Sequence, residues 1–157
     1  MPAASDQPGA GDSLPELPRT WRPLGIRLAV VFFGTLLVLV CLAAWLGFND
    51  SVRSKFTFLQ LATVVGMIGV AGFVGWLLAR ARVTAAEDGI VVVNGLSTRR
   101  LAWEEVLAVH LPPGAPWAVL DLSDGTTISA MAFQQTDGDR AQRGVRELRA
   151  LLDRPAA

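Results

Sequence analysis

Two long apolar runs constrain this chain more than any other feature. Residues 28–48, LAVVFFGTLLVLVCLAAWLGF, carry no charged side chain, and residues 56–78, FTFLQLATVVGMIGVAGFVGWLL, have Gln60 as their only strongly polar one. At about 1.5 Å of helical rise per residue, each run is long enough to cross a hydrocarbon core about 30 Å thick. The short segment between them forces the two helices to be antiparallel. The sequence therefore predicts a transmembrane hairpin within residues 21–79.

The basic residues that flank the hairpin predict its orientation, because Arg and Lys near the ends of membrane helices favour the cytoplasmic side. Five lie on the side of the two chain termini and two lie in the connecting loop: Arg19, Arg22, Arg27, Arg80 and Arg82 against Arg53 and Lys55. Trp45 and Trp76, each near a helix end, suit the interfacial aromatic belts. We therefore expect a multi-pass plasma-membrane protein with both termini in the cytoplasm.

The residues before the hairpin have a different composition. Residues 1–20 are rich in Pro, Gly, Ala, Ser and Asp and offer little to bury, so we expect a disordered N-terminal tail. The first apolar run is longer than the core of a signal peptide and follows this polar tail, so we expect it to be retained. The single cysteine, Cys41, excludes an intramolecular disulfide.

Residues 80–153 have the pattern of a small β-rich domain that ends in a helix. Short apolar runs alternate with turn signals, and the Asn94-Gly95 and Asp124-Gly125 pairs supply the positive φ that tight hairpin turns require. About six such strands indicate an antiparallel meander. In the last segment Ala141, Val145, Leu148 and Leu152 fall on one stripe of a helix, which Asp137 or Asp139 is placed to cap. The predicted class is α+β: a two-helix transmembrane hairpin, a small antiparallel β-barrel or sheet, and one C-terminal amphipathic helix.

This order of elements resembles a known family. The segments RVTAAEDGIVVVNG, RRLAWEEVLAVHL and DLSDGTTI, followed by the helix, resemble the small bacterial pleckstrin-homology (PH)-like domains of the actinobacterial, membrane-anchored type represented by low molecular weight protein antigen 6. The resemblance implies a PH-like fold behind two membrane helices, and no defined activity. Eukaryotic relatives of the fold often bind inositol phosphates through a basic first loop. The loop we align with it, residues 85–89, is acidic, which argues against that mode of binding.

Small residues recur along the second apolar run. Gly66, Gly69, Gly72 and Gly75 lie every third position and form a groove that lets another helix approach closely. Two partners are compatible with this pattern: the first apolar helix of the same chain, which we favour, and a helix of a separate protein.

Arginines recur along the C-terminal helix. Arg140, Arg143, Arg146 and Arg149 cover the arc opposite its apolar stripe. An ordinary solvated face explains this row. The alternative is contact with anionic lipid headgroups or with an acidic partner, since the domain is tethered beside a membrane surface.

No residues form a pattern that carries chemistry. Trp103 is expected in the structural core, and His110, the only histidine, has no second ligand with which to build a zinc site. The chain has no nucleophile motif and no phosphate-binding loop, so we expect no enzyme activity, no cofactor and no metal site. Its 14 basic and 14 acidic residues balance, which argues against nucleic-acid binding through a global basic excess.

Two functional hypotheses follow. The first is a non-enzymatic interaction or scaffolding module, held at the cytoplasmic face of the plasma membrane and in contact with lipid and with an unidentified protein partner. The alternative is an accessory subunit of a membrane transporter or membrane enzyme that acts through its glycine-rich second helix. A homo-oligomer is compatible with either hypothesis.

Overall fold

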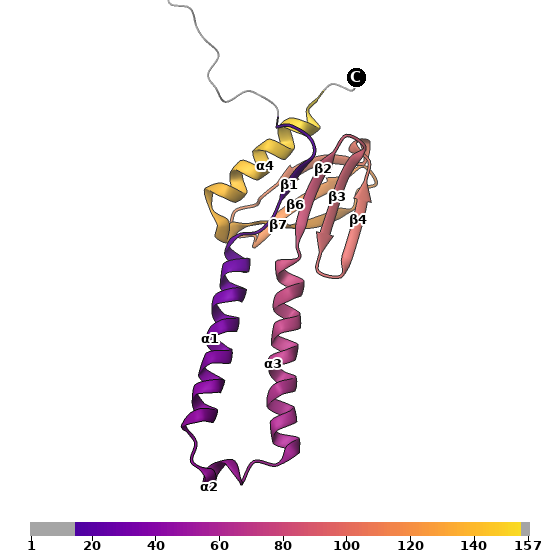
Figure 1. Ribbon diagram of the computed structural model, residues 1–157. Coiled ribbons are helices and arrows are strands. Elements are labelled where there is room, and N and C mark those ends of the chain that lie inside the picture. The colour runs from indigo at the N-terminus through magenta and orange to yellow at the C-terminus, as the bar shows by residue number, and fades with distance from the viewer. Residues whose placement is uncertain (1–14, 155–157) are drawn as a thin grey trace, which may run out of the picture.

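The computed structural model describes residues 15–154, which form a helical hairpin joined to a β-domain (Figure 1). Helix α1 (Gly25–Gly47) and helix α3 (Phe58–Ala79) run antiparallel, with the short helix α2 (Asp50–Arg53) in the turn between them. Both long helices meet the length and hydropathy expected of a membrane span. Their side chains are largely exposed, unlike those of a core helix in a soluble protein.

The cap of α3 explains where this helix begins. The helix starts at Phe58, two residues inside the apolar run. The Thr57 hydroxyl accepts a hydrogen bond from the Gln60 backbone N–H (3.3 Å), and Gln60 Oε1 accepts one from the Thr57 N–H (3.0 Å). This reciprocal cap satisfies backbone donors that the first helical turn leaves unpaired. Gln60, the only strongly polar side chain of the run, thus caps the start of α3.

The β-domain consists of two antiparallel sheets and a helix. The first sheet has the strand order β1 (Arg19–Trp21), β2 (Arg82–Ala86), β3 (Gly89–Asn94), β4 (Ser97–Leu101), and the second has the order β5 (Val106–His110), β6 (Trp117–Leu122), β7 (Thr127–Gln134). The 3-10 helix η1 (Trp103–Glu105) connects the sheets, and η2 (Gln135–Asp137) leads into helix α4 (Asp139–Leu152). The meander and the C-terminal helix are confirmed. The sheets do not close, so the word barrel does not apply.

Alternate residues of both sheets and one face of α4 form the core. Its largest fully buried side chains include Phe133, Ile90, Leu120, Leu148 and Val83. On α4 the predicted stripe is buried at Ala141, Val145 and Leu148, but Leu151 completes it in place of Leu152, which is partly exposed. Helical periodicity thus identified the buried face and misplaced its last member by one residue.

Strand β1 departs from the sequence-based expectation. It precedes α1, where we expected the end of a disordered tail, and pairs with β2 beyond the hairpin, with Arg19 opposite Ala85 and Trp21 opposite Val83. The β-domain therefore includes residues on both sides of the hairpin and does not begin at residue 80. Residues 1–14 of the expected tail lie outside the described residues. A strand of three residues has too short a pattern to recognise, and only pairing with a neighbour stabilises it.

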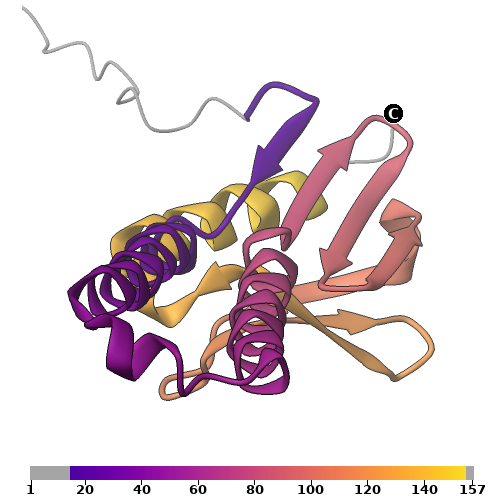
Figure 2. The same cartoon turned by 60° about the horizontal axis from the view of Figure 1, so that its bottom comes forward.

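The position of β1 makes the helical hairpin the connection between the first two strands of the sheet (Figure 2). Residues 85–89, which we aligned with the first loop of ligand-binding relatives, include the turn between β2 and β3. The connection from β1 to β2 contains α1, α2 and α3. That the acidic residues 85–89 disfavour inositol phosphate binding stays a prediction.

Candidate functional site at the joint between the helices and the β-domain

Asp137 binds the first turn of α1 from the β-domain. Its Oδ1 accepts a hydrogen bond from Gly25 N (2.8 Å), and its Oδ2 accepts one from Leu24 N (3.0 Å). Leu24, the residue at the N-cap of α1, has no side-chain acceptor of its own. A carboxylate there pairs orphan donors and also lies at the positive end of the helix dipole. We expected Asp137 or Asp139 to cap the C-terminal helix, but the N-cap of α4 is Gly138, with no side-chain cap.

Gly25 allows the Asp137 carboxylate to approach α1 closely. A Cβ atom at position 25 would lie 2.8 Å from Asp137 Oδ1, closer than such atoms approach in proteins. Any other residue at Gly25 therefore displaces the carboxylate that caps the helix. The contact depends on a residue pair 112 positions apart in the chain.

Helix α4 binds strand β1 through Glu147. The Trp21 indole N–H donates a hydrogen bond to Glu147 Oε2 (2.9 Å), and Arg19 Nη2 lies 3.1 Å from the same oxygen. The Trp21 ring packs on Phe133, with 5.6 Å between the ring centroids. Gly144 of α4 leaves room for this pair, since a Cβ there would lie 2.6 Å from a Phe133 ring carbon. The segment that enters α1 is thus fastened to α4 and to β7.

The end of α3 is bound in a complementary way. Arg27 of α1 donates a hydrogen bond from Nε to the carbonyl of Ala79 (3.0 Å), which places a cation at the negative end of the α3 dipole. The Arg80 guanidinium lies over the Trp76 ring, 5.3 Å from its centroid. Each helix end at the joint therefore meets a charge of the favourable sign. Together the contacts of Asp137, Glu147 and Arg27 define what we call the joint.

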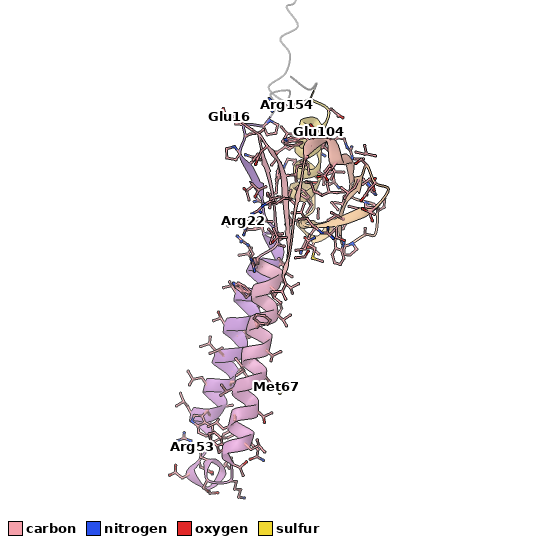
Figure 3. The ribbon with its side chains drawn as sticks, turned by 90° about the vertical axis from the view of Figure 1, so that its right-hand side faces the viewer. Glu16, Arg22, Arg53, Met67, Glu104 and Arg154 are labelled. Carbon is pink, nitrogen blue, oxygen red and sulfur yellow. The ribbon has the colours of Figure 1, made fainter. Side chains whose placement is uncertain are left out.

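The far end of the hairpin is closed by a separate group of contacts. Arg53 donates hydrogen bonds to the carbonyls of Trp45 (3.1 Å) and Leu46 (3.0 Å) at the end of α1. The Phe56 ring packs on Trp45 and on Phe48, each at 5.7 Å between centroids. Figure 3 shows Arg53 at this end of the hairpin and Arg22 at the opposite end, beside the β-domain.

The glycines of α3 do not act together. A Cβ atom at Gly75 would lie 2.8 Å from Val30 of α1, so this glycine allows the two helices to approach closely. At Gly66, Gly69 and Gly72 a Cβ atom would meet nothing within 4 Å among the described residues. The first helix of the same chain, the partner that we favoured, therefore covers one glycine of the four.

The arginines of α4 are all exposed, and the structure separates one of them from the rest. Arg149 donates a hydrogen bond from Nη2 to the carbonyl of Val109 on β5 (2.8 Å), so it fastens α4 to the edge of the second sheet. Within residues 15–154, Arg140, Arg143 and Arg146 form no hydrogen bond or ion pair with a side chain. These three remain available to a ligand.

Trp103 is partly buried and packs against the core. Its indole N–H is shared between the carbonyls of Ala86 (3.1 Å) and Glu87 (3.2 Å), so it anchors η1 to the turn between β2 and β3. His110 lies 3.2 Å from an Asp121 carboxylate oxygen on the neighbouring strand, in a half-exposed pair. Trp103 of η1 and His110 of β5 therefore both have structural contacts.

The remaining acidic groups do not assemble into a centre. In the part of the chain that the structure describes, no three His, Cys, Asp or Glu side chains are placed to hold one metal ion. At the turn between β6 and β7, hydrogen bonds from the Thr126 hydroxyl (2.7 Å) and the Thr126 backbone N–H (2.8 Å) lower the pKa of Asp124. This carboxylate is fully exposed, and its contacts are those of a tight turn.

The joint is the arrangement with the clearest physical consequence. It connects the first turn of α1 to the β-domain, and the end of α3 to α1, through hydrogen bonds, so a rotation of α1 is resisted by the domain and by α3. Sequence analysis missed the contacts of Asp137 with α1 and of Glu147 with Trp21, because these partners lie more than a hundred residues away. One signal was visible: Pro23 and Leu24 precede the first helix without a capping side chain, which implies an acceptor from elsewhere.

Comparisons with known proteins identify a family for the segment that follows the hairpin. A family model described as a bacterial PH domain matches residues 80–151. Two relatives are the uncharacterized proteins Rv1417 of Mycobacterium tuberculosis and Mb1452 of Mycobacterium bovis, each 41% identical to the chain over 78 residues. The match covers 50% of this chain and 51% of each relative, so the chain spans about half the length of the curated relatives that it matches. No solved structure matches the chain significantly.

Proposed function

Residues 80–151 belong to the bacterial PH domain family, and we propose that this domain, completed by β1, is a membrane-anchored, non-enzymatic interaction module. In this proposal α1 and α3 span the plasma membrane, and the β-domain presents its surface to a protein partner at the cytoplasmic face. The observation that carries the proposal is the insertion of the helical hairpin between β1 and β2. A domain built around its anchor is held at a set height and angle, as a docking platform requires.

The charge distribution supports the orientation. Five arginines lie at or near the joint, against Arg53 and Lys55 at the far end of the hairpin. Two of the five also serve as contacts of the joint: Arg19 with Glu147, and Arg27 with the carbonyl of Ala79. A cytoplasmic reporter fused after the C-terminus should be active, and a periplasm-dependent phosphatase there should be silent. The reverse readout refutes the orientation, and recovery of the active cytoplasmic reporter in the soluble fraction refutes the anchor.

The surface that meets the partner is proposed to be the exposed face of α4. Arg140, Arg143 and Arg146 lie there without side-chain partners among the described residues, and a basic row suits an acidic segment of another protein. Recruitment by such charges depends on salt, because exposed charges are screened over about 8 Å at physiological ionic strength.

The test uses the full chain in its native membrane, since a fragment from Arg82 onward would lack β1 and expose the core beneath Trp21. Mild crosslinking and mass spectrometry identify the proteins that accompany the wild type. The double variant Arg143→Glu, Arg146→Glu should lose the specific partner. The matched control Arg99→Glu, Arg100→Glu reverses two exposed charges on β4 and should retain it. Loss in both variants, or in neither, refutes α4 as the surface.

A second candidate function rests on the open glycines. Three glycines of α3 are open: a Cβ atom added at Gly66, Gly69 or Gly72 would have no neighbour within 4 Å among the described residues. This favours close packing against a helix of a membrane transporter or membrane enzyme. Gly69→Leu should then abolish capture of the partner, whereas Gly34→Leu, at an equally open glycine of α1, should not. Crosslinks between copies of the chain that Gly69→Leu removes would instead identify a homo-oligomer.

A further inference from the structure

We infer that the turn between β3 and β4, with Leu96 at its tip, rests in the interfacial layer of the bilayer that α1 and α3 span. The inference relies on the proposed membrane anchor and adds a third point of support for the β-domain. The turn contacts lipid, at the level where the headgroups meet the acyl chains.

The topology of the first sheet places this turn beside the membrane. In an antiparallel meander, alternate connections lie at the same end of the sheet. The hairpin connects β1 to β2, so the connection between β3 and β4 must lie at the hairpin end. The register agrees: Arg82, close behind α3, is opposite Val93, and Asn94 is opposite Ser97, so the strands turn at residues 95–96. Figure 1 shows this turn beside the upper end of α3.

The height of the tip follows from chain geometry. From Ala79, where α3 ends, to Arg82 the chain rises at most about 10 Å. From Val93, level with Arg82, the hairpin returns by about two residues, or roughly 7 Å. The tip therefore lies at most about 3 Å above the level of Ala79. Trp76, one turn deeper, is exposed as interfacial tryptophans are, and the interfacial layer is about 5–8 Å thick on each side.

Leu96 has the side chain that this position favours. It is 74% exposed, although a leucine gains nothing from contact with water. Outside α1, α3 and the residues that adjoin them, the only other large hydrophobic side chain so exposed among the described residues is Leu107, at 66%. A single exposed leucine needs no explanation by itself. Its place at the tip, level with the helix end, is what points to lipid.

The turn is held firmly enough to keep this position. Gly95 has φ +55°, which permits the two-residue turn, and Leu96 keeps a negative φ. The Asn94 side chain donates a hydrogen bond to the carbonyl of Ser129 and accepts one from Met131 N (3.2 Å), so it fixes the hairpin to β7. With the joint at α1 and the covalent link from α3 to β2, the tip provides a third point, and three points define a plane against the bilayer.

The experiment uses the full chain, with Cys41→Ser, reconstituted in vesicles of phosphatidylethanolamine and phosphatidylglycerol. Single cysteines at Leu96, Leu107 and Leu39 carry a small fluorophore, and lipids brominated near the headgroup or near the bilayer centre act as quenchers. The probe at Leu96 should be quenched several-fold more strongly than that at Leu107 by bromines near the headgroup. The probe at Leu39, in the middle of α1, should be quenched by bromines near the centre.

The outcomes separate the inference from the anchor on which it depends. Equal, weak quenching at Leu96 and Leu107 with strong quenching at Leu39 overturns the contact of the turn with lipid and leaves the membrane anchor intact. Weak quenching at all three positions overturns the anchor itself. In the variant Asp137→Ala the probe at Leu96 should still be quenched, but by bromines at a different depth. That result would further support a domain held by three points.

Discussion

Replacing Asp137 with alanine should loosen the first turn of α1 and leave the rest of the fold in place. The substitution removes the acceptors of Gly25 N and Leu24 N, at 2.8 and 3.0 Å, and no local side chain replaces them. Loss of a capping side chain costs about 0.5–2 kcal/mol. Because one of the two amides is exposed to solvent and can bind water, we expect about 1 kcal/mol.

Amide hydrogen exchange in lipid nanodiscs measures this effect where it occurs. A loss of about 1 kcal/mol in the local opening free energy corresponds to roughly fivefold faster exchange, since about 1.4 kcal/mol is a factor of ten. The acceleration should be confined to the amides of Leu24 and Gly25 and the turn that follows. Asp137→Asn, which keeps an acceptor oxygen without the charge, should give a smaller acceleration.

The matched control is Asp139→Ala, two residues away on the exposed start of α4. It removes a carboxylate that forms no hydrogen bond with α1, so exchange at Leu24 and Gly25 should not change. Unaltered exchange at these amides in Asp137→Ala, or an equal acceleration in both variants, would refute the role of Asp137 as the cap of α1.

Three further predictions concern the β-domain. Gly144→Ala should lower the thermal midpoint, because overpacking by about 1–3 kcal/mol outweighs the roughly 1 kcal/mol that alanine gains over glycine inside a helix. Glu147→Ala should cost about 1–2 kcal/mol in denaturant unfolding, since the half-buried Trp21 indole N–H loses its acceptor. The pKa of Asp124 should lie below its ordinary value and rise in Thr126→Val, as followed by carboxyl NMR titration. Because the folded state lowers that pKa, the stabilisation is complete above the ordinary pKa of aspartate and is lost as the pH falls through the lowered one.

The Glu147 prediction has a matched control, and each of the three predictions has a result that would contradict it. Arg19→Ala removes only an exposed ion pair with Glu147 and should cost well under about 1 kcal/mol. An equal cost for Arg19→Ala and Glu147→Ala would show that the indole contact contributes little. A stabilised Gly144→Ala would show that Phe133 moves aside freely, and an unchanged Asp124 pKa in Thr126→Val would remove the hydroxyl as its main cause.

Local patterns in the sequence were sufficient for the individual elements. The apolar runs predicted α1 and α3, the Asn-Gly and Asp-Gly pairs predicted turns with Gly95 and Gly125 at positive φ, and helical spacing predicted the buried face of α4. These features depend on residues a few positions apart. The resemblance to bacterial PH domains rested on the same local patterns, and the family match at residues 80–151 confirms it.

The candidate site was not predictable in this way. The pairing of Arg19 with Ala85, the cap from Asp137 to Gly25 and the hydrogen bond from Trp21 to Glu147 join residues that are distant in sequence. Each of these residues had a plausible local explanation, as tail, as cap of the C-terminal helix or as solvated helix face. When local structure already explains a residue, the sequence gives no sign of its distant contact, because a single sequence does not show which residues meet in the fold.

The sequence by itself determined that this chain has an apolar helical hairpin and a β-rich domain with a terminal helix, because hydropathy and turn chemistry act over short distances along the chain. Only the tertiary structure decided that the hairpin is inserted within the domain, between β1 and β2. Strand β1 has three residues and no stability of its own. Its place exists only once β2, Phe133 and Glu147 have been brought together by the fold of the remaining chain.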